Sequence, residues 1–184
     1  MILTVSGFIG SGKTTVARAL AERYNLKHIS AGVVFRELAK KKGLSLQEFS
    51  ALAERNPTID REIDDLQREK ASKGNVVAEG RLSGWLLQAD FKIWLEASLE
   101  TRARRVATRE GKSYEAAMEE TRTREESELK RYKEIYGIDL RDLSPYNIVI
   151  DTEIWSATEV VDLITSVISL IERGEKIGRT KAHN

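Results

Sequence analysis

The stretch Gly7-Phe8-Ile9-Gly10-Ser11-Gly12-Lys13-Thr14 decides the fold of this chain. Its glycines let the backbone turn N–H groups inward around phosphate oxygens, and a helix that follows adds the positive end of its dipole. The apolar run at 2–6 predicts a buried strand before the stretch, and apolar residues at helical spacing predict a helix from 13 to about 24. A match with both flanks in place has few false positives. We therefore expect a loop that cradles the phosphates of a nucleoside triphosphate.

Three side chains at the end of this loop have expected roles. Lys13 reaches the β and γ phosphates, Thr14 holds Mg²⁺ through its hydroxyl, and Thr15 contacts the α phosphate from the helix N-terminus. The expected cofactor is therefore Mg²⁺, bound together with the triphosphate.

Four more short apolar runs, at 27–30, 75–78, 91–95 and 147–150, alternate with helical patterns. Strands that alternate with helices form a parallel sheet covered on both faces, which binds ligands beyond the carboxyl ends of its strands. The fold class is thus α/β, a P-loop NTPase fold. Two helical stretches at 45–73, the second opened by Pro57, predict a helical excursion from the sheet.

Composition narrows the function further. The 184 residues are 41% hydrophobic and 32% charged with a net charge of +1, which is typical of one soluble domain and demands neither nucleic acid nor a membrane. No apolar run approaches the roughly 20 residues of a spanning helix, and Met1 leads straight into a strand, so the expected location is the cytoplasm. The absence of cysteine excludes disulfides and thiolate chemistry, and two histidines argue against a histidine-based metal centre.

Regulatory GTPases would add an Asp-x-x-Gly switch and an Asn-Lys-x-Asp guanine reader, and neither tetrapeptide occurs. Phosphoryl transfer to a small acceptor would instead need cations around a second phosphate. Ser30 and Gly32 lie in the loop after the second strand, Arg36 lies one turn into the next helix, and Arg81 follows the third strand. The two arginines could converge on one anion, although each alone also fits a surface salt bridge.

A long charged segment at 99–136, broken by Gly111 and ended by Gly137, carries further arginines. Spacings of four and three put Arg124, Glu128 and Arg131 on one helical face, which could meet a phosphate and a ribose or form a self-satisfied surface ladder. A stripe with the same two interpretations lies earlier in the segment and consists of Arg102, Arg105 and Arg109.

Taken together, these motifs resemble the nucleoside monophosphate kinases, and most of all the archaeal type of cytidylate kinase. The resemblance covers nearly the whole chain: the phosphate loop, Ile29-Ser30-Ala31-Gly32 with Arg36, Glu79-Gly80-Arg81, the arginine-rich segment, and Asn147-Ile148-Val149-Ile150-Asp151 before a last helix. It implies a single domain over 1–173 with a five-stranded parallel core (1–42, 75–98 and 138–173), a helical monophosphate-binding arm (about 43–74) and a lid (about 99–137). The polar remainder, 174–184, is expected to be a flexible tail.

The resemblance also implies roles for residues. Arg36, Arg81 and Arg131 hold the acceptor's phosphate, Arg124 and Glu128 lie near its ribose, and with Lys13 the four arginines form the catalytic set. Arg105 and Arg109 approach ATP from the lid, and 151–155 pass close to the adenine. The implied ATP-binding residues are Gly7, Phe8, Ile9, Gly10, Ser11, Gly12, Lys13, Thr14, Thr15, Arg105 and Arg109.

Two departures from the bacterial cytidylate kinases affect recognition of the base. Leu82 follows Glu79-Gly80-Arg81 where those enzymes place an acid, and the arm carries Asp60 where they place a base-reading arginine. We expect Asp60, Asp64 and Ser83 to substitute, although helix-surface acids and a turn serine fit equally. The implied monophosphate-binding residues are Ser30, Gly32, Arg36, Asp60, Asp64, Arg81, Ser83, Arg124, Glu128 and Arg131.

The resemblance implies transfer of the γ-phosphoryl group of ATP to CMP and dCMP, within pyrimidine nucleotide metabolism. Its partners would be these nucleotides, without nucleic acid or membrane, and the protein would be a monomer. Two alternatives stay open: a kinase for AMP, UMP or a non-nucleotide acceptor, and a P-loop regulatory or nucleic-acid-binding module, against which the near-zero net charge argues.

Overall fold

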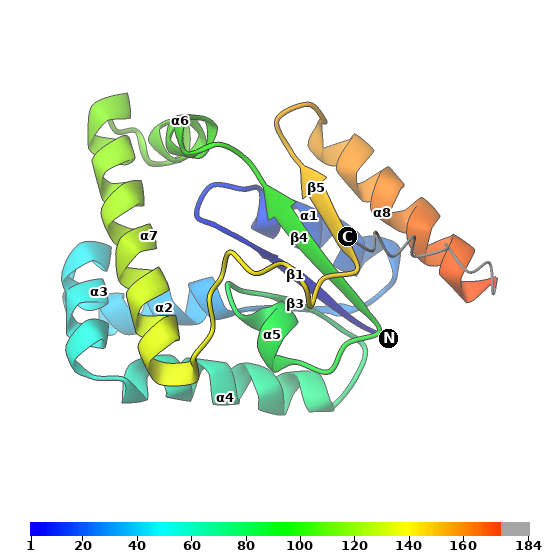
Figure 1. The fold of residues 1–184 in the computed structure, drawn as a ribbon, viewed down its shortest axis with the longest axis horizontal. Coiled ribbons are helices and arrows are strands. Elements are labelled where there is room, and N and C mark those ends of the chain that lie inside the picture. The colour runs from blue at the N-terminus through cyan, green and yellow to red at the C-terminus, as the bar shows by residue number, and fades with distance from the viewer. Residues whose placement is uncertain (174–184) are drawn as a thin grey trace, which may run out of the picture.

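One parallel sheet forms the centre of the protein in the computed structural model, which describes residues 1–173 (Figure 1). Its strand order is β2-β3-β1-β4-β5, and the strands are β1 (Ile2–Gly7), β2 (Lys27–Ser30), β3 (Val76–Glu79), β4 (Phe91–Glu96) and β5 (Ile148–Asp151). The predicted five-stranded parallel sheet is confirmed, with the third and fifth strands shifted by one residue. Because the chain builds β2 and β3 on one side of β1 and β4 and β5 on the other, the loop after β1 lies where the strand order reverses.

Eight helices surround the sheet in the described part of the chain. They are α1 (Lys13–Arg23), α2 (Ala31–Lys41), α3 (Leu46–Arg55), α4 (Thr58–Ser72), α5 (Ser83–Leu86), α6 (Leu99–Glu110), α7 (Tyr114–Tyr136) and α8 (Ala157–Glu172). The helices predicted within 45–73 and 99–136 are therefore present, while the predicted tail at 174–184 lies outside the described residues.

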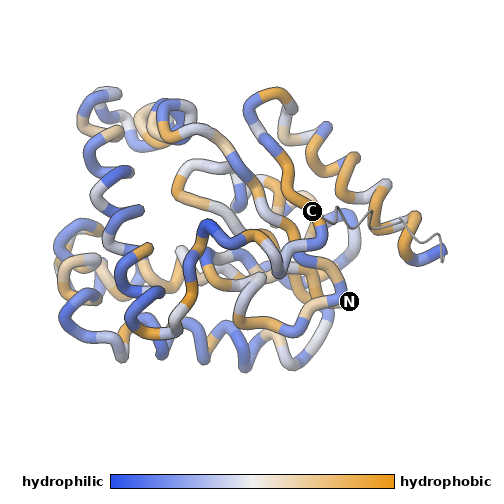
Figure 2. The backbone as a smooth tube through the Cα atoms, in the orientation of Figure 1, coloured by the Kyte–Doolittle hydropathy of each residue, from blue (hydrophilic) through white to orange (hydrophobic). Residues whose placement is uncertain are grey.

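Apolar side chains of the strands point alternately to the two faces of the sheet, so each face has a hydrophobic core. On one face α1 and α8 pack against the strands through a cluster that includes Leu20, Ile164 and Ile93. On the other face Trp94 and Leu140 centre a second cluster, to which α5 and the end of α7 contribute. Figure 2 shows orange, hydrophobic tube along the strands and α8, and mainly blue tube along α7. None of the helices in the described chain is long and apolar enough to cross a membrane.

The helical excursion α2–α4 has a small core of its own around the fully buried Phe49. Ser45 begins α3 with a reciprocal capping box to Glu48, and Pro57 precedes α4 as predicted. In Figure 1 the long helix α7 runs from α6 down to α4. It therefore connects α6 with the helical excursion α2–α4.

Candidate active site

A cavity of about 770 Å³ lies over the carboxyl ends of β1 and β3. It is bordered by the phosphate loop, α2, α4, α6 and α7, so it gathers side chains from segments far apart in the sequence. Most of the predicted site residues line it: Ile9, Gly10, Ser11, Gly12, Lys13, Thr14, Thr15, Gly32, Arg36, Asp60, Asp64, Arg81, Arg105, Arg109, Arg124, Glu128 and Arg131.

Four predicted site residues do not line this cavity. Phe8 packs edge-on against Trp94 behind the loop, with ring centroids 5.3 Å apart, and a Cβ on Gly7 would come within 2.3 Å of a neighbouring backbone oxygen. The hydroxyl of Ser30 accepts a hydrogen bond from the N–H of Val33 and so caps α2. These three positions shape the loop and the strand ends from outside the cavity.

Ser83, the fourth, corrects an expectation. Its side chain is fully buried, and its hydroxyl bonds the hydroxyl of Ser6 at 2.9 Å and the carbonyl of Gly80 at 3.1 Å. A hydroxyl with these two partners behind the cavity cannot reach a base, so the prediction that Ser83 reads the base is wrong.

The phosphate loop holds its lysine in a dry environment. Lys13 is only 6% exposed, and its Nζ donates to the carbonyl of Phe8 at 2.7 Å. Burial, and then the nearby guanidinium of Arg81, hold the pKa of Lys13 well below its usual value. The protein thus balances the positive charge of Lys13 poorly, and an anion bound in the cavity would stabilise that charge.

Glu79 is a site residue that the sequence analysis did not assign. It ends β3 beside the loop, and its Oε1 accepts a hydrogen bond from the Thr14 hydroxyl at 2.6 Å. Despite burial, hydrogen bonds from His28 and Thr14 lower its pKa, so the carboxylate is ionised. Gln67 fixes the adjoining backbone by donating to the Glu79 carbonyl at 2.9 Å. The place of Glu79 at a strand's carboxyl end, next to the loop, is the signal that could have identified it.

Thr14 and Glu79 together fit the expected Mg²⁺. Mg²⁺ takes oxygen ligands, keeps several waters and is usually held by few protein groups along with the substrate's phosphates. A hydroxyl and an ionised carboxylate side by side supply this chemistry. The described residues contain no group of three or more His, Cys, Asp or Glu side chains that could hold a metal ion.

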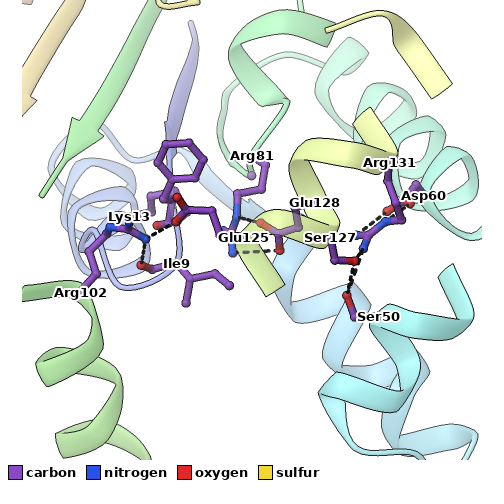
Figure 3. Close-up of polar contacts among 12 residues, drawn as sticks. Ile9, Lys13, Ser50, Asp60, Arg81, Arg102, Glu125, Ser127, Glu128 and Arg131 are labelled. Carbon is purple, nitrogen blue, oxygen red and sulfur yellow. Dashed lines mark hydrogen bonds and ion pairs between the residues drawn. The ribbon is translucent and has the colours of Figure 1, made fainter. Parts of the chain in front are cut away.

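For Arg102, burial excludes the surface interpretation of the stripe on α6. Only 4% exposed, Arg102 donates to the Ile9 carbonyl at 3.2 Å and to Glu125 of α7 at 2.6 Å, and it lies over the ring of Phe8 (Figure 3). It therefore ties the phosphate loop to both α6 and α7. Spacing could not have separated Arg102 from Arg109, which is largely exposed and pairs with Glu110. Both lie on the same helical stripe.

Arg105 occupies the rim between α6 and the end of β5. Its guanidinium donates to the hydroxyl and the carbonyl of Thr152 at 2.8 and 2.6 Å. Trp155, three residues farther along the chain, lines the same part of the cavity. This side of the cavity thus combines a cation with an aromatic surface.

The charged face of α7 is buried and is not a surface ladder. Figure 3 shows its side chains reaching two different neighbours. Glu128 accepts two hydrogen bonds from Arg81, at 2.6 and 3.3 Å. Burial opposes the charge of Arg81, but Glu128 outweighs it, so the pKa of Arg81 is raised.

Arg131 makes the second of these contacts. Its guanidinium donates to Asp60 at 2.7 and 3.4 Å and to the hydroxyls of Ser50 and Ser127 at 3.0 and 2.6 Å. Arg131 is 2% exposed and Asp60 is 4% exposed. Most N–H groups of Arg131 therefore already have protein acceptors, which leaves it little capacity for a ligand.

Arg36 and Arg124 differ from Arg81 and Arg131 because nearby acids balance little of their positive charge. Within the described chain Arg36 has no hydrogen bond or ion pair, and Arg124 has only a 3.8 Å ion pair with Glu120. Burial lowers the pKa of both guanidiniums; Arg109 adds to this at Arg36, whereas Glu128 opposes it at Arg124. These two cations are free to bind an anion.

The acids of α4 are also buried, so the alternative of helix-surface acids is wrong for Asp60 and Asp64. Asp64 is 7% exposed and accepts a hydrogen bond from the Tyr136 hydroxyl at 2.7 Å. Burial raises the pKa of Asp64 to about 7; the Tyr136 hydrogen bond opposes this, and the charge of Asp60 adds to it.

This raised pKa predicts a pH-dependent effect of Asp64→Asn on stability. Between about pH 4 and pH 7 the folded protein retains a proton at Asp64 that the unfolded chain has lost, so this group lowers the free energy of unfolding as pH rises. The variant cannot ionise there. Its stability relative to wild type should therefore rise across that window, by at most about 1.4 kcal/mol per pH unit, and level off above it.

Urea unfolding between pH 5 and pH 8 measures this difference. Asp65→Asn, which changes an exposed acid paired with Arg68 one position along α4, is the matched control and should show no such trend. A constant difference between Asp64→Asn and wild type at every pH would contradict the raised pKa.

Comparison with known proteins places this geometry in context. The model of the cytidylate kinase-like family matches residues 2–154. The chain is 49% identical over 173 residues to a Pyrococcus horikoshii protein named cytidylate kinase, with 94% of this chain and 90% of that protein covered. Proteins with the same name from Methanopyrus kandleri and Methanocaldococcus jannaschii are 50% and 48% identical, each covering 94% of this chain and 96% and 100% of their own lengths.

Solved structures support the fold class at lower identity. A shikimate kinase from Acinetobacter baumannii in complex with shikimate has a TM-score of 0.57 at 20% identity and covers 96% of this chain and 95% of its own. A deoxyadenosine kinase from M. mycoides with bound dATP has a TM-score of 0.58 at 18% identity, with 92% and 99% covered. The predicted P-loop fold is confirmed.

Proposed function

This chain belongs to the cytidylate kinase-like family, and from that premise we propose that it transfers the γ-phosphoryl group of ATP to CMP, giving CDP and ADP. We extend the proposal to dCMP. The observation that carries it is one cavity in which a phosphate loop with an undercompensated lysine faces two arginines, Arg36 and Arg124, whose charge the described residues leave largely unmatched. A kinase with two phosphorylated substrates needs a cationic site for each phosphate group.

On the donor side, loop N–H groups and Lys13 would hold the triphosphate of ATP. Thr14 and Glu79 would hold the hydrated Mg²⁺, which when bound neutralises phosphate charge and orients the triphosphate. Trp155 offers an apolar surface for the adenine, and Arg105, which is hydrogen-bonded to Thr152, lines the same cavity. Burial of Lys13 strengthens its attraction for the charge that develops on the transferred group.

On the acceptor side, Arg36 and Arg124 would bind the phosphate of CMP. Arg81 would also bind this phosphate, but more weakly, because Glu128 is already hydrogen-bonded to it and balances part of its charge. The expectation that Arg131 holds this phosphate is revised, because its guanidinium is engaged by Asp60 and two serines. We assign Arg131 to the orientation of Asp60 and to the connection between α7 and the arm helices α3 and α4.

Asp60 and Asp64 would read the base. Cytosine presents an exocyclic amine, from which a carboxylate oxygen can accept a hydrogen bond, whereas uracil presents a carbonyl at the same position. An ionised carboxylate therefore attracts the first base and repels the second. We assign this discrimination mainly to Asp60, which is paired with Arg131, because a pKa of about 7 leaves Asp64 partly protonated near neutral pH. Both acids line the cavity from α4, which fits the role of the arm in acceptor binding.

The reaction needs no covalent intermediate and no general base, because the acceptor phosphate is ionised near neutral pH. Positioning and charge neutralisation supply the catalysis. We propose that α6 and α7 form the lid that excludes water, since water in the cavity would compete with CMP for the phosphoryl group.

A coupled ADP-release assay with ATP and CMP, dCMP, UMP, AMP or GMP tests this proposal. We expect CMP to be the best acceptor, with dCMP close to it and UMP lower by at least about 100-fold in kcat/KM, since a polar reader discriminates strongly. Reactions without acceptor measure ATP hydrolysis. If UMP or AMP equals CMP, the substrate assignment fails and the kinase class survives; if no acceptor releases ADP, the class fails as well.

A further inference from the structure

His28 lies next to the proposed site without lining its cavity. It belongs to the edge strand β2, and its ring borders a separate groove on the far side of Glu79. The Nε2 atom of His28 lies 2.8 Å from Oε2 of Glu79. Since Oε1 of the same carboxylate accepts the hydrogen bond of Thr14, His28 and Thr14 hold the two oxygens of one side chain.

The sheet register explains why these three residues meet. His28 is paired with Val77 and Ser30 with Glu79 in the parallel ladder of β2 and β3. His28 and Glu79 are therefore diagonal neighbours on one face of the sheet, a separation that long side chains can bridge. The helix α1, which begins with Lys13 and Thr14, packs against the same strands and delivers the threonine to the other oxygen of Glu79.

The chemistry of the pair fixes which atom donates. Glu79 is 4% exposed, and a carboxylate accepts hydrogen bonds at both of its oxygens, here from the Thr14 hydroxyl at Oε1 and from the His28 ring at Oε2. The proton of the His28–Glu79 hydrogen bond therefore lies on Nε2. A buried carboxylate held at both oxygens loses its rotational freedom, which is how surrounding groups orient metal-site ligands in proteins.

We propose that His28 is a positioning residue: by holding one oxygen of Glu79 it aims the other at the Thr14 hydroxyl, and so organises the two oxygen donors that would hold the hydrated Mg²⁺. The inference rests on the proposed function, because it assigns His28 to the phosphoryl-transfer site. A histidine that only fills space at the sheet edge would affect stability alone.

Two substitutions separate these possibilities. His28→Leu keeps much of the volume and removes the donor, whereas His28→Gln keeps an N–H that can reach Glu79. Relative to wild type, we expect His28→Leu to lower kcat about 10-fold and to raise the Mg²⁺ concentration for half-maximal rate by a similar factor. The KM for CMP should stay within about twofold, and His28→Gln should recover most of the loss. If His28→Leu does not fold, His28→Asn, which is too short to reach Glu79, replaces it.

A second measurement does not depend on activity. The chain has two histidines, so ¹⁵N NMR of the ring nitrogens is simple to assign with His183→Gln as reference. We expect a protonated Nε2 at His28 whose signal shifts in Glu79→Gln. An unprotonated Nε2, equal losses in His28→Leu and His28→Gln, or wild-type kinetics in His28→Leu would each overturn the proposal. If wild type fails to phosphorylate CMP, the function fails while the NMR result still decides the His28–Glu79 bond.

Discussion

Changing Lys13 to Ala should lower kcat by about 1,000-fold or more with every acceptor and leave the folded protein at least as stable as wild type. The catalytic loss follows because the transferred group would lose a cation that is held in place and shielded from water. The preserved stability follows from burial. Lys13 is almost fully buried, its pKa is depressed, and among the described residues its side chain has one hydrogen bond, to the Phe8 carbonyl. Removing an undercompensated charge removes its desolvation cost.

The coupled assay gives kcat, and thermal unfolding gives the stability. Lys73→Ala is a suitable control, because Lys73 is an exposed lysine whose partner is Glu69 on the same helix. It should change neither quantity by a measurable amount. Retained activity in Lys13→Ala would contradict the role given to the loop, and a large fall in melting temperature would contradict the argument from burial.

Replacement of Arg124 by Met should lower kcat/KM for CMP by about 100-fold without destabilising the fold. The side chain lines the cavity, and its single ion pair within the described residues, with Glu120, is long at 3.8 Å. Its charge is therefore available to the acceptor phosphate, and a charge-assisted bidentate contact to a phosphate is strong. Steady-state kinetics with varied CMP, together with urea unfolding, measure the two effects.

Arg131→Met, on the same face of α7, is the matched comparison. It would leave Asp60 buried without its partner, so we expect a loss of about 3–5 kcal/mol in the free energy of unfolding. The two arginines should thus separate: Arg124 mainly affects catalysis and Arg131 mainly affects stability. The reverse pattern would show that the acceptor phosphate displaces Asp60 from Arg131.

Local patterns in the sequence were sufficient for the architecture. Strands of a parallel sheet are apolar runs, most helices of the described chain have serine or proline at the N-cap, as at Ser45 and Pro57, and α6 and α7 end at a glycine, as at Gly137. The phosphate loop could be identified because its chemistry lies within eight consecutive residues. The boundaries of the five strands and of α1 were therefore correct to within about a residue, whereas the short helix α5 was not predicted.

Pairing between distant side chains could not be obtained in this way. Arg102 and Arg109 share one stripe of α6, yet the first is buried against the loop and the second is largely exposed. Asp60 and Arg131 are 71 positions apart and meet only because α7 crosses α4. Which charged side chains pair with each other depends on tertiary contacts. The sequence alone therefore does not distinguish an arginine that has a protein counterion from one that is available to a ligand.

The buried pair of Asp60 and Arg131 also bears on how such sequences can diverge. An arginine in place of Asp60 alone would set two guanidiniums against each other in a site almost closed to water. Changing either residue of the pair alone would destabilise the fold, so the two positions should change together in the course of evolution. Replacing this contact then requires a paired change, one on α4 and one on α7.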